Sequence, residues 1–262
     1  MKVAYPKLMV ALFLTTVPWV MTSSANILVN GNFEDPGIAL TTDYVGYSAD
    51  NDTAIPGWYL RPTTSDGPSF AIYYTQSTPG DRTTAWWIPN AQNGAFLMQL
   101  DSTQSTGFTV GCSLYQVISL VSGTEYELSF WINTEVGTGK GGTSASLLNV
   151  GTLTGAANIG AIGTSYISNQ TFTVTNPANV TAAAAVWQQH SIRFTATASG
   201  DTVIRFADSP TSDNSNVSLD NVSLVVVPEP SVVMGAMLLL GLVGWRERKR
   251  IRVLFRREES NA

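Results

Sequence analysis

Aromatic rings and small polar side chains crowd the stretch from residue 58 to residue 92, a mixture typical of a carbohydrate-binding surface. Sugars pack their flat faces on aromatic rings, while nearby amides and carboxylates bond the hydroxyl groups. The surrounding Pro, Gly, Asp and Asn residues predict that the aromatic residues of this stretch, including Trp58 and Tyr59, lie in loops. For any single ring the alternative is packing in the core, which we expect for Trp58 and Trp187. The residues expected to hold the ligand are Trp86, Trp87, Tyr73, Tyr74, Asp81 and Asn90.

Residues suited to catalysis are scarce. His190 is the only histidine, and it opens an alternating pattern in which a surface position is the ordinary explanation. The chain has no G-x-S-x-G elbow, no H-E-x-x-H pair and no Cys–His pairing. Two carboxylates would serve glycoside hydrolysis only at a set separation. We therefore expect no catalytic residues and no enzyme activity, with a glycoside-active enzyme as a remote alternative.

The elements that must position these residues are strands. Gly, Thr, Ser and Asn are plentiful, and no long helical period runs between Asn26 and Val227, so the sequence predicts an all-β sandwich. In the clearest strand, Tyr126–Asn133, alternate residues are apolar, and Trp131 falls on the mixed face, as a cover or a lining for a polar cleft. Further strands are expected at Ala95–Leu100, Ser113–Leu120, His190–Thr197, Thr202–Ala207 and Val217–Val226, with one or two more around Tyr166–Val174 in the small-residue segment 136–185.

The last of these strands contains an irregularity. Val217 and Leu219 are apolar at odd positions, whereas Val222 and Leu224 are apolar at even ones. A strand changes faces only through an extra residue, so we expect a bulge near Asp220 that redirects its side chain.

The charge of the chain is unevenly distributed. Residues 26–227 hold five basic and fifteen acidic residues, a formal charge of −10, whereas the whole chain carries −5. Phosphate binding needs clustered Lys and Arg, so this acidic body argues against a nucleic-acid partner. An acidic body of this kind is suited to binding divalent cations and neutral polymers.

Six short motifs stand in order along the body, and together they resemble a known fold family. The chain is similar to the galactose-binding-like jelly roll shared by DUF642 proteins and several carbohydrate-binding modules. The small-residue segment after Trp131 departs from that pattern. The motifs are Asn26–Glu34, Ile55–Trp58, Gly94–Leu100, Leu114–Val117, Gly123–Trp131 and Ser218–Leu224. The resemblance implies a single jelly-roll β-sandwich that serves as a non-catalytic module.

The same resemblance implies a structural calcium ion that ties the first strand to the last. The matching positions are Glu34 and Asp220, and Asn32 could add a backbone carbonyl. Calcium takes six to eight hard oxygen ligands, which carboxylates and carbonyls supply. The alternative is that the two carboxylates only accept hydrogen bonds from loop amides. A bound ion would clamp the fold and take no part in catalysis.

The N-terminus has the three parts of a secretory signal peptide. Lys2 and Lys7 precede the apolar run Leu8–Val20, and small residues end at Ala25. We expect cleavage after Ala25 and export across the inner membrane. The alternative is a first transmembrane helix, against which the short run and Pro18 both argue.

The C-terminus resembles the PEP-CTERM sorting signal of bacteria that make exopolysaccharide and biofilm. Pro228, Glu229 and Pro230 precede the short apolar run Val232–Trp245 and a basic cluster. The run is short for a permanent span, which needs about 20 apolar residues, and the basic residues would stay cytoplasmic. The resemblance implies that an exosortase, a membrane enzyme, recognises the segment and cleaves near Pro228–Pro230. A plain C-terminal anchor is the alternative.

These patterns divide the chain into a signal peptide (1–25), a jelly-roll domain (26–227), a sorting signal with a short transmembrane helix (228–250) and a basic cytoplasmic tail (251–262). We expect an exported protein of the cell envelope or extracellular biofilm matrix that binds polysaccharide or exopolysaccharide. It would meet the inner membrane only transiently, before C-terminal processing. The alternative is a structural matrix protein that acts through protein–protein contacts.

Overall fold

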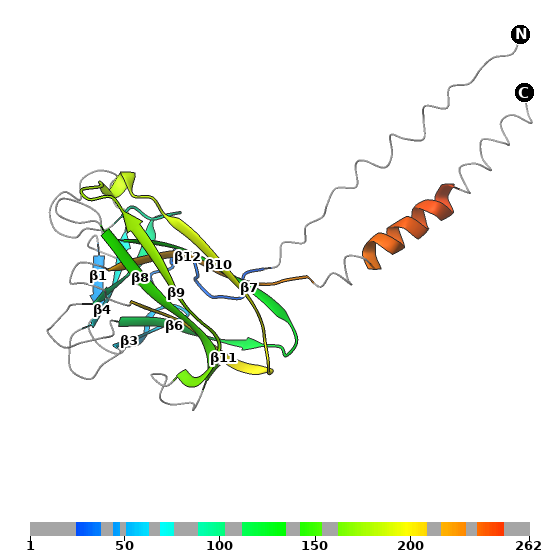
Figure 1. Ribbon diagram of the computed structural model, residues 1–262, viewed down its shortest axis with the longest axis horizontal. Coiled ribbons are helices and arrows are strands. Elements are labelled where there is room, and N and C mark those ends of the chain that lie inside the picture. Colours follow the sequence, from blue (N-terminus) through cyan, green and yellow to red (C-terminus); the bar gives the residue numbers. More distant parts are fainter. Residues whose placement is uncertain are drawn as a thin grey trace, which may run out of the picture.

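The body of the protein is a two-layer β-sandwich (Figure 1). The computed structural model describes residues 25–37, 44–47, 51–62, 69–75, 89–102, 112–134, 142–153, 162–208, 216–228 and 235–248. Twelve strands in this part of the chain form two six-stranded antiparallel sheets. The first sheet has the order β1 (Tyr44–Tyr47), β4 (Ser69–Thr75), β5 (Phe96–Ser102), β12 (Val217–Val226), β7 (Glu125–Thr134) and β10 (Gln188–Thr195). The second has the order β2 (Asn51–Ile55), β3 (Trp58–Pro62), β6 (Cys112–Leu120), β11 (Gly200–Asp208), β8 (Gly142–Leu153) and β9 (Ile162–Asn176).

The connections between strands pass from one sheet to the other. From β5 onward, every connection except β8–β9 crosses between the sheets. Such alternation in a double antiparallel sheet is the arrangement of a jelly roll. The all-β prediction is therefore confirmed.

The strongest sequence patterns predicted their strands well. β12 has the predicted bounds, and β5, β6, β7, β10 and β11 differ from prediction by no more than two residues at either end. In the small-residue segment, β9 covers the predicted strand and β8 is an additional one. The segment is therefore a long hairpin whose weak apolar content hides its alternation.

The core forms between the sheets from the apolar positions of each strand. On β7, Tyr126, Leu128, Phe130 and Ile132 are buried and the residues between them are less so, as predicted. Rings from both sheets meet here: Phe206 lies 5.1 Å from Phe130 and 6.5 Å from Trp58, between ring centroids. Trp58 is 1% exposed, which confirms its core position.

Two sequence interpretations are wrong. Trp58 and Tyr59 lie on β3, and Tyr73 and Tyr74 lie on β4, instead of in loops. Aromatic residues favour strands, and pairing with the neighbouring strands outweighs the turn-forming residues around them.

The surface position expected for His190 is the second error. His190 alternates with the buried Ile192 and Phe194, so it faces the core. Its ring centroid lies 5.8 Å from that of Phe130 and 5.0 Å from that of Phe172. Burial lowers the pKa of His190, because a low-dielectric surrounding disfavours the charged imidazolium.

The first described residues are fastened to the last strand. The Ile27 N–H donates to Leu224 O at 2.8 Å, and the Val222 N–H donates to Gly31 O at 2.7 Å. The Asn26 side chain donates to Val222 O and accepts from the Leu224 N–H. Both ends of the body therefore lie at the same end of the sandwich.

A separate helix spans residues 235–248 and is exposed along nearly its whole length. Figure 1 shows it apart from the two sheets. The helix adds no residue to the core, and every core residue in the described part of the chain lies within residues 26–227. In the described part of the chain no helix is long and apolar enough to cross a membrane. Residues 229–234 and 249–262 lie outside the described residues, as do residues 1–24, which include most of the predicted signal peptide.

Candidate ligand-binding row and carboxylate centre

The residues predicted to hold a sugar are only partly described. Trp86, Trp87 and Asp81 lie outside the described residues. Tyr73 and Tyr74 pair with Met98 and Leu97 of β5, in the first sheet. The backbone carbonyl of Asn90 accepts a hydrogen bond of 2.9 Å from the Trp187 indole, which is half-buried.

A different set of polar and aromatic residues crosses the second sheet in one straight row. The strand registers place its five members directly opposite one another, one on each of β3, β6, β11, β8 and β9. We call this set the transverse row: Tyr59, Tyr115, Arg205, Asn149 and Asn169. Directly opposed residues share a face of a sheet, so all five belong to one face.

That face is the outer one. Arg205 stands between Ile204 and Phe206, and Asn149 stands between Leu148 and Val150; these four apolar neighbours belong to the core between the sheets. Successive side chains of a strand point to opposite faces. The transverse row therefore lies on the side of the second sheet away from the core.

The members of the row are held by one another. The rings of Tyr59 and Tyr115 stack with centroids 5.1 Å apart and an interplanar angle of 10°. Arg205 donates to Asn149 Oδ1 from Nε at 3.1 Å and from Nη2 at 2.6 Å. Asn149 Nδ2 in turn donates to Asn169 Oδ1 at 2.9 Å. Mutual bonding fixes the rotamers of the row before any ligand arrives.

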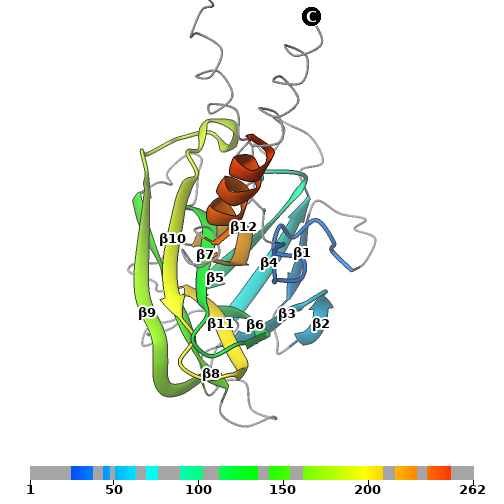
Figure 2. The same cartoon turned by 90° about the vertical axis from the view of Figure 1, so that its right-hand side faces the viewer.

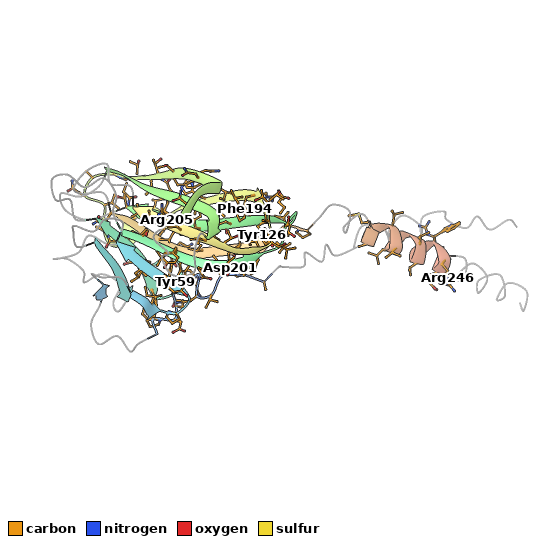
Figure 3. The ribbon with its side chains drawn as sticks, turned by 90° about the horizontal axis from the view of Figure 1, so that it is seen from below. Tyr59, Tyr126, Phe194, Asp201, Arg205 and Arg246 are labelled. Carbon is orange, nitrogen blue, oxygen red and sulfur yellow. The ribbon has the colours of Figure 1, made fainter. Side chains whose placement is uncertain are left out.

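Exposure changes along the row. Tyr115 and Asn149 are buried, Tyr59 and Arg205 are half-buried, and Asn169 is exposed. Figure 3 shows Tyr126 and Phe194 toward the end of the sandwich that faces the helix, with Tyr59 and Arg205 further from it. Tyr115 forms a second buried cluster with Val203, against which Tyr59 packs. The accessible groups of the row are therefore those of Tyr59, Arg205 and Asn169, and none of its five members carries a carboxyl group.

The two acids predicted as metal ligands fasten one loop. Glu34 accepts hydrogen bonds from the N–H groups of Ala95 and Phe96. Asp220 accepts from the N–H groups of Gln92 at 2.8 Å and Asn93 at 3.3 Å. We call Glu34 and Asp220 the carboxylate centre, and it holds residues 92–96 at the start of β5.

The predicted bulge brings Asp220 to this centre. The register of β12 against β7 shifts between Asp220 and Ser223, and Asn221 has a φ of 53°. Asp220 Oδ1 accepts the Asn221 N–H at 2.6 Å. The predicted bulge near Asp220 is confirmed.

Burial dominates the electrostatics of the carboxylate centre. The Asp220 side chain is fully buried, and this raises its pKa from 3.8 to about 7. The three backbone N–H groups oppose the shift, and the negative charge of Glu34 adds to it. Gly94 makes the close packing feasible: its φ is 75°, and a Cβ atom there would collide with the Glu34 carboxylate.

The oxygen atoms of this centre are of the kind that bind calcium. Carboxylate oxygens are the ligands that calcium prefers. A cation would offset both the burial of Asp220, which is the main cause of its raised pKa, and the smaller repulsion by Glu34. Two carboxylate oxygens offer about four lone-pair positions, and three N–H donors occupy some of those on Asp220. Among the described residues, no three Asp, Glu, His or Cys side chains lie close enough together to hold a metal ion. Amide or backbone oxygens, such as that of Asn32, would have to complete the shell.

Sequence reasoning missed the transverse row. The sequence feature that could have indicated the row is a single polar residue between apolar ones, as in Leu148-Asn149-Val150 and Ile204-Arg205-Phe206. Each is unremarkable alone, because the row exists only through the pairing of strands distant in sequence.

Comparison with known proteins reveals the fold and little more. No family model and no curated protein matches the chain. A cyclase from Fischerella sp. TAU is 18% identical, with a TM-score of 0.54 over 79% of this chain and 98% of that chain. The Stig cyclase Fisc of the same source, in complex with an indole compound, is 18% identical, with a TM-score of 0.52 over 79% and 99%. At such identity these likenesses establish a shared sandwich fold alone.

Carbohydrate-binding modules with jelly-roll folds are also among the similar structures. A family 61 module in complex with β-1,4-galactotriose is 14% identical, with a TM-score of 0.39 over 78% of this chain and 100% of that chain. That score is too low to bear on the function of this chain.

Proposed function

We propose that the sandwich is a non-catalytic module that binds polysaccharide along the transverse row. The observation that carries this proposal is a straight line of stacked rings and hydrogen-bonded amides across five strands. Aromatic faces pack on sugar rings, and amide and guanidinium groups bond hydroxyls. With strands about 4.8 Å apart, the row spans roughly 19 Å, which suits an oligosaccharide segment better than a single sugar.

The sequence-derived aromatic loop remains a competing site within the same proposal. Trp86 and Trp87 lead into residues 89–96, which Trp187, Asp220 and Glu34 hold against the first sheet. Neither tryptophan belongs to the transverse row, whose five members all lie on the second sheet. The two sites are therefore separable by mutation.

The test is affinity electrophoresis of residues 26–227 through gels that carry a panel of polysaccharides. We expect one polymer to retard the protein, and Asn169→Ala and Tyr59→Ala to weaken the retardation. Gln170→Ala is the matched control, because Gln170 is also exposed and adjoins Asn169 on β9 but faces the other side. Loss only in Trp86→Ala or Trp87→Ala would move the site to the two tryptophans, and no retardation by any polymer would contradict the function.

We further propose that the chain is exported by its signal peptide and processed by an exosortase near Pro228–Pro230. Pro228 is exposed and lies two residues beyond the end of β12. The proposed sorting signal therefore begins just after the last strand of the sandwich. Mass spectrometry of the mature protein should find an N-terminus at Asn26 and a C-terminus close to Glu229. An intact C-terminal tail on the mature protein would contradict the processing.

We also propose that the carboxylate centre holds a structural calcium ion. Glu34 and Asp220 would be its charged ligands, with carbonyl oxygens near Asn32 as neutral ones. The ion would supply positive charge between two neighbouring acids, and the residues would clamp the N-terminal segment to residues 92–96. Isothermal calorimetry measures calcium binding directly, and Glu34→Gln should bind calcium more weakly than the wild type.

A further inference from the structure

The described sandwich has four sheet edges, and three of them carry features that discourage strand addition. An exposed edge presents unpaired backbone N–H and C=O groups, which proteins protect with short strands, irregular pairing or charge. β1 has four residues, and β2 has five with irregular pairing to β3. β10 carries Arg193, whose 61% exposed side chain pairs with Glu127 at 2.7 Å.

The fourth edge, β9, has none of these protections where it pairs regularly with β8. It is fifteen residues long and contains no Pro and no charged residue. In the sequence, no Asp, Glu, Lys or Arg occurs between Lys140 and Arg193. Figure 2 shows β9 at the outer side of the sandwich.

The geometry of β9 is regular where it is most exposed. Residues Ser168–Asn176 pair with Gly142–Val150 without interruption, and the register shifts occur only beyond Val150. The side chains of Asn169, Gln170, Thr171 and Thr173 are exposed. The uncharged edge Ser168–Val174, seven residues long, is long enough to add another strand.

We propose that β9 pairs through its free edge with β9 of a second copy of this chain, antiparallel and about a two-fold axis. A two-fold contact uses the same patch on both subunits, and opposed Thr and Asn side chains pair well across strands. The charge distribution favours this place: the body carries −10 overall, so two copies repel elsewhere, whereas the β8–β9 hairpin brings no charge to the contact.

Such pairing would join the second sheets of two copies into one sheet. Asn169 ends the transverse row on β9, so the two rows would approach each other on one continuous outer face. If the proposed polysaccharide binding holds, one polymer would meet two rows, and avidity would exceed the affinity of either row.

The experiment is sedimentation velocity on residues 26–227, which contain every core residue in the described part of the chain, across a wide concentration range. We expect a reversible dimer, weakened about tenfold or more by Thr171→Lys with Thr173→Lys, because opposed like charges oppose strand pairing. Thr197→Lys is the matched control, since Thr197 is equally exposed but lies in the turn after β10, and it should leave the dimer intact.

Hydrogen–deuterium exchange on the unmodified protein gives a second readout, in case the lysine variant does not fold. Protection of the amides of residues 168–174 should rise with protein concentration, and that of residues 188–195 should not. A monomer at every concentration, a dimer indifferent to the lysines, or protection that rises elsewhere would overturn the proposal. A monomer that still binds polysaccharide would overturn it and leave the proposed function standing.

Discussion

The carboxylate centre and the transverse row are both built from polar side chains, but they bond to different partners. Glu34 and Asp220 accept hydrogen bonds from backbone N–H groups of residues 92–96 and Asn221. The row bonds side chain to side chain, from Arg205 to Asn149 to Asn169. A carboxylate that satisfies buried backbone groups holds the fold together. Side chains that bond to one another on an outer face tie no backbone segment down, and for this row we propose a role in ligand binding.

The largest effect should follow from Asp220→Ala. The change leaves three backbone N–H groups without their acceptor, and buried unsatisfied donors are costly. We expect a loss of about 4 kcal/mol and a melting temperature lower by about 12 °C. Differential scanning calorimetry measures both, with Asp201→Ala, an exposed acid of β11, as the control. Equal melting of the two variants would mean that Asp220 does not fasten the loop.

Removal of calcium should have the next largest effect. An ion held at a hundredfold excess over its dissociation constant stabilises a protein by about 2.7 kcal/mol. We expect chelation to lower the melting temperature by about 8 °C, and Glu34→Gln to remove that response. An unchanged melt after chelation of protein known to be metal-loaded would reject calcium at the carboxylate centre.

Without divalent cations, stability should fall as the pH rises from 5 to 7. The folded-state pKa of Asp220, about 7, lies above its unfolded value of 3.8, so the protonated form favours folding. Its contribution is complete below about pH 4 and is lost as the pH passes through 7, a change of about 2 kcal/mol between pH 5 and pH 7.

Urea denaturation of the wild type and of Asp220→Asn at both pH values isolates this effect. The wild type should lose more stability than the variant between pH 5 and pH 7. Calcium should reverse the trend, because a bound cation keeps the carboxylate ionised. Parallel pH curves for the two proteins would mean that Asp220 titrates normally.

The smallest change in stability should accompany Asn169→Ala. Asn169 is exposed, but its Oδ1 accepts a hydrogen bond from the buried Asn149 side chain, so we expect a loss of about 1 kcal/mol. Loss of one hydrogen bond to a sugar hydroxyl should weaken polysaccharide binding by about 1 kcal/mol, roughly fivefold. Isothermal calorimetry with the retained polymer measures the affinity, and unaltered affinity would remove Asn169 from the site.

Local patterns were enough to predict the sandwich, the bulge and the buried Trp58. Period-two alternation is strong in Tyr126–Asn133, and the change of parity around Asp220 has few structural solutions. The strand pairings were beyond local patterns, because Tyr59, Asn149 and Asn169 become neighbours only through contacts between distant segments. His190 was misplaced for a related reason: its polarity indicated a surface, while its register on β10 faces Phe130.

The most direct test of the separation between the two regions is a paired measurement of melting temperature and polysaccharide affinity on one set of variants. Asp220→Asn should lower the melting temperature and leave the affinity of the folded protein unchanged. Tyr59→Ala and Asn169→Ala should weaken binding, and Asn169→Ala should melt within about 3 °C of the wild type. Full affinity in both row variants, or lost affinity in folded Asp220→Asn, would contradict the division between a carboxylate centre that holds the fold and a row that binds ligand.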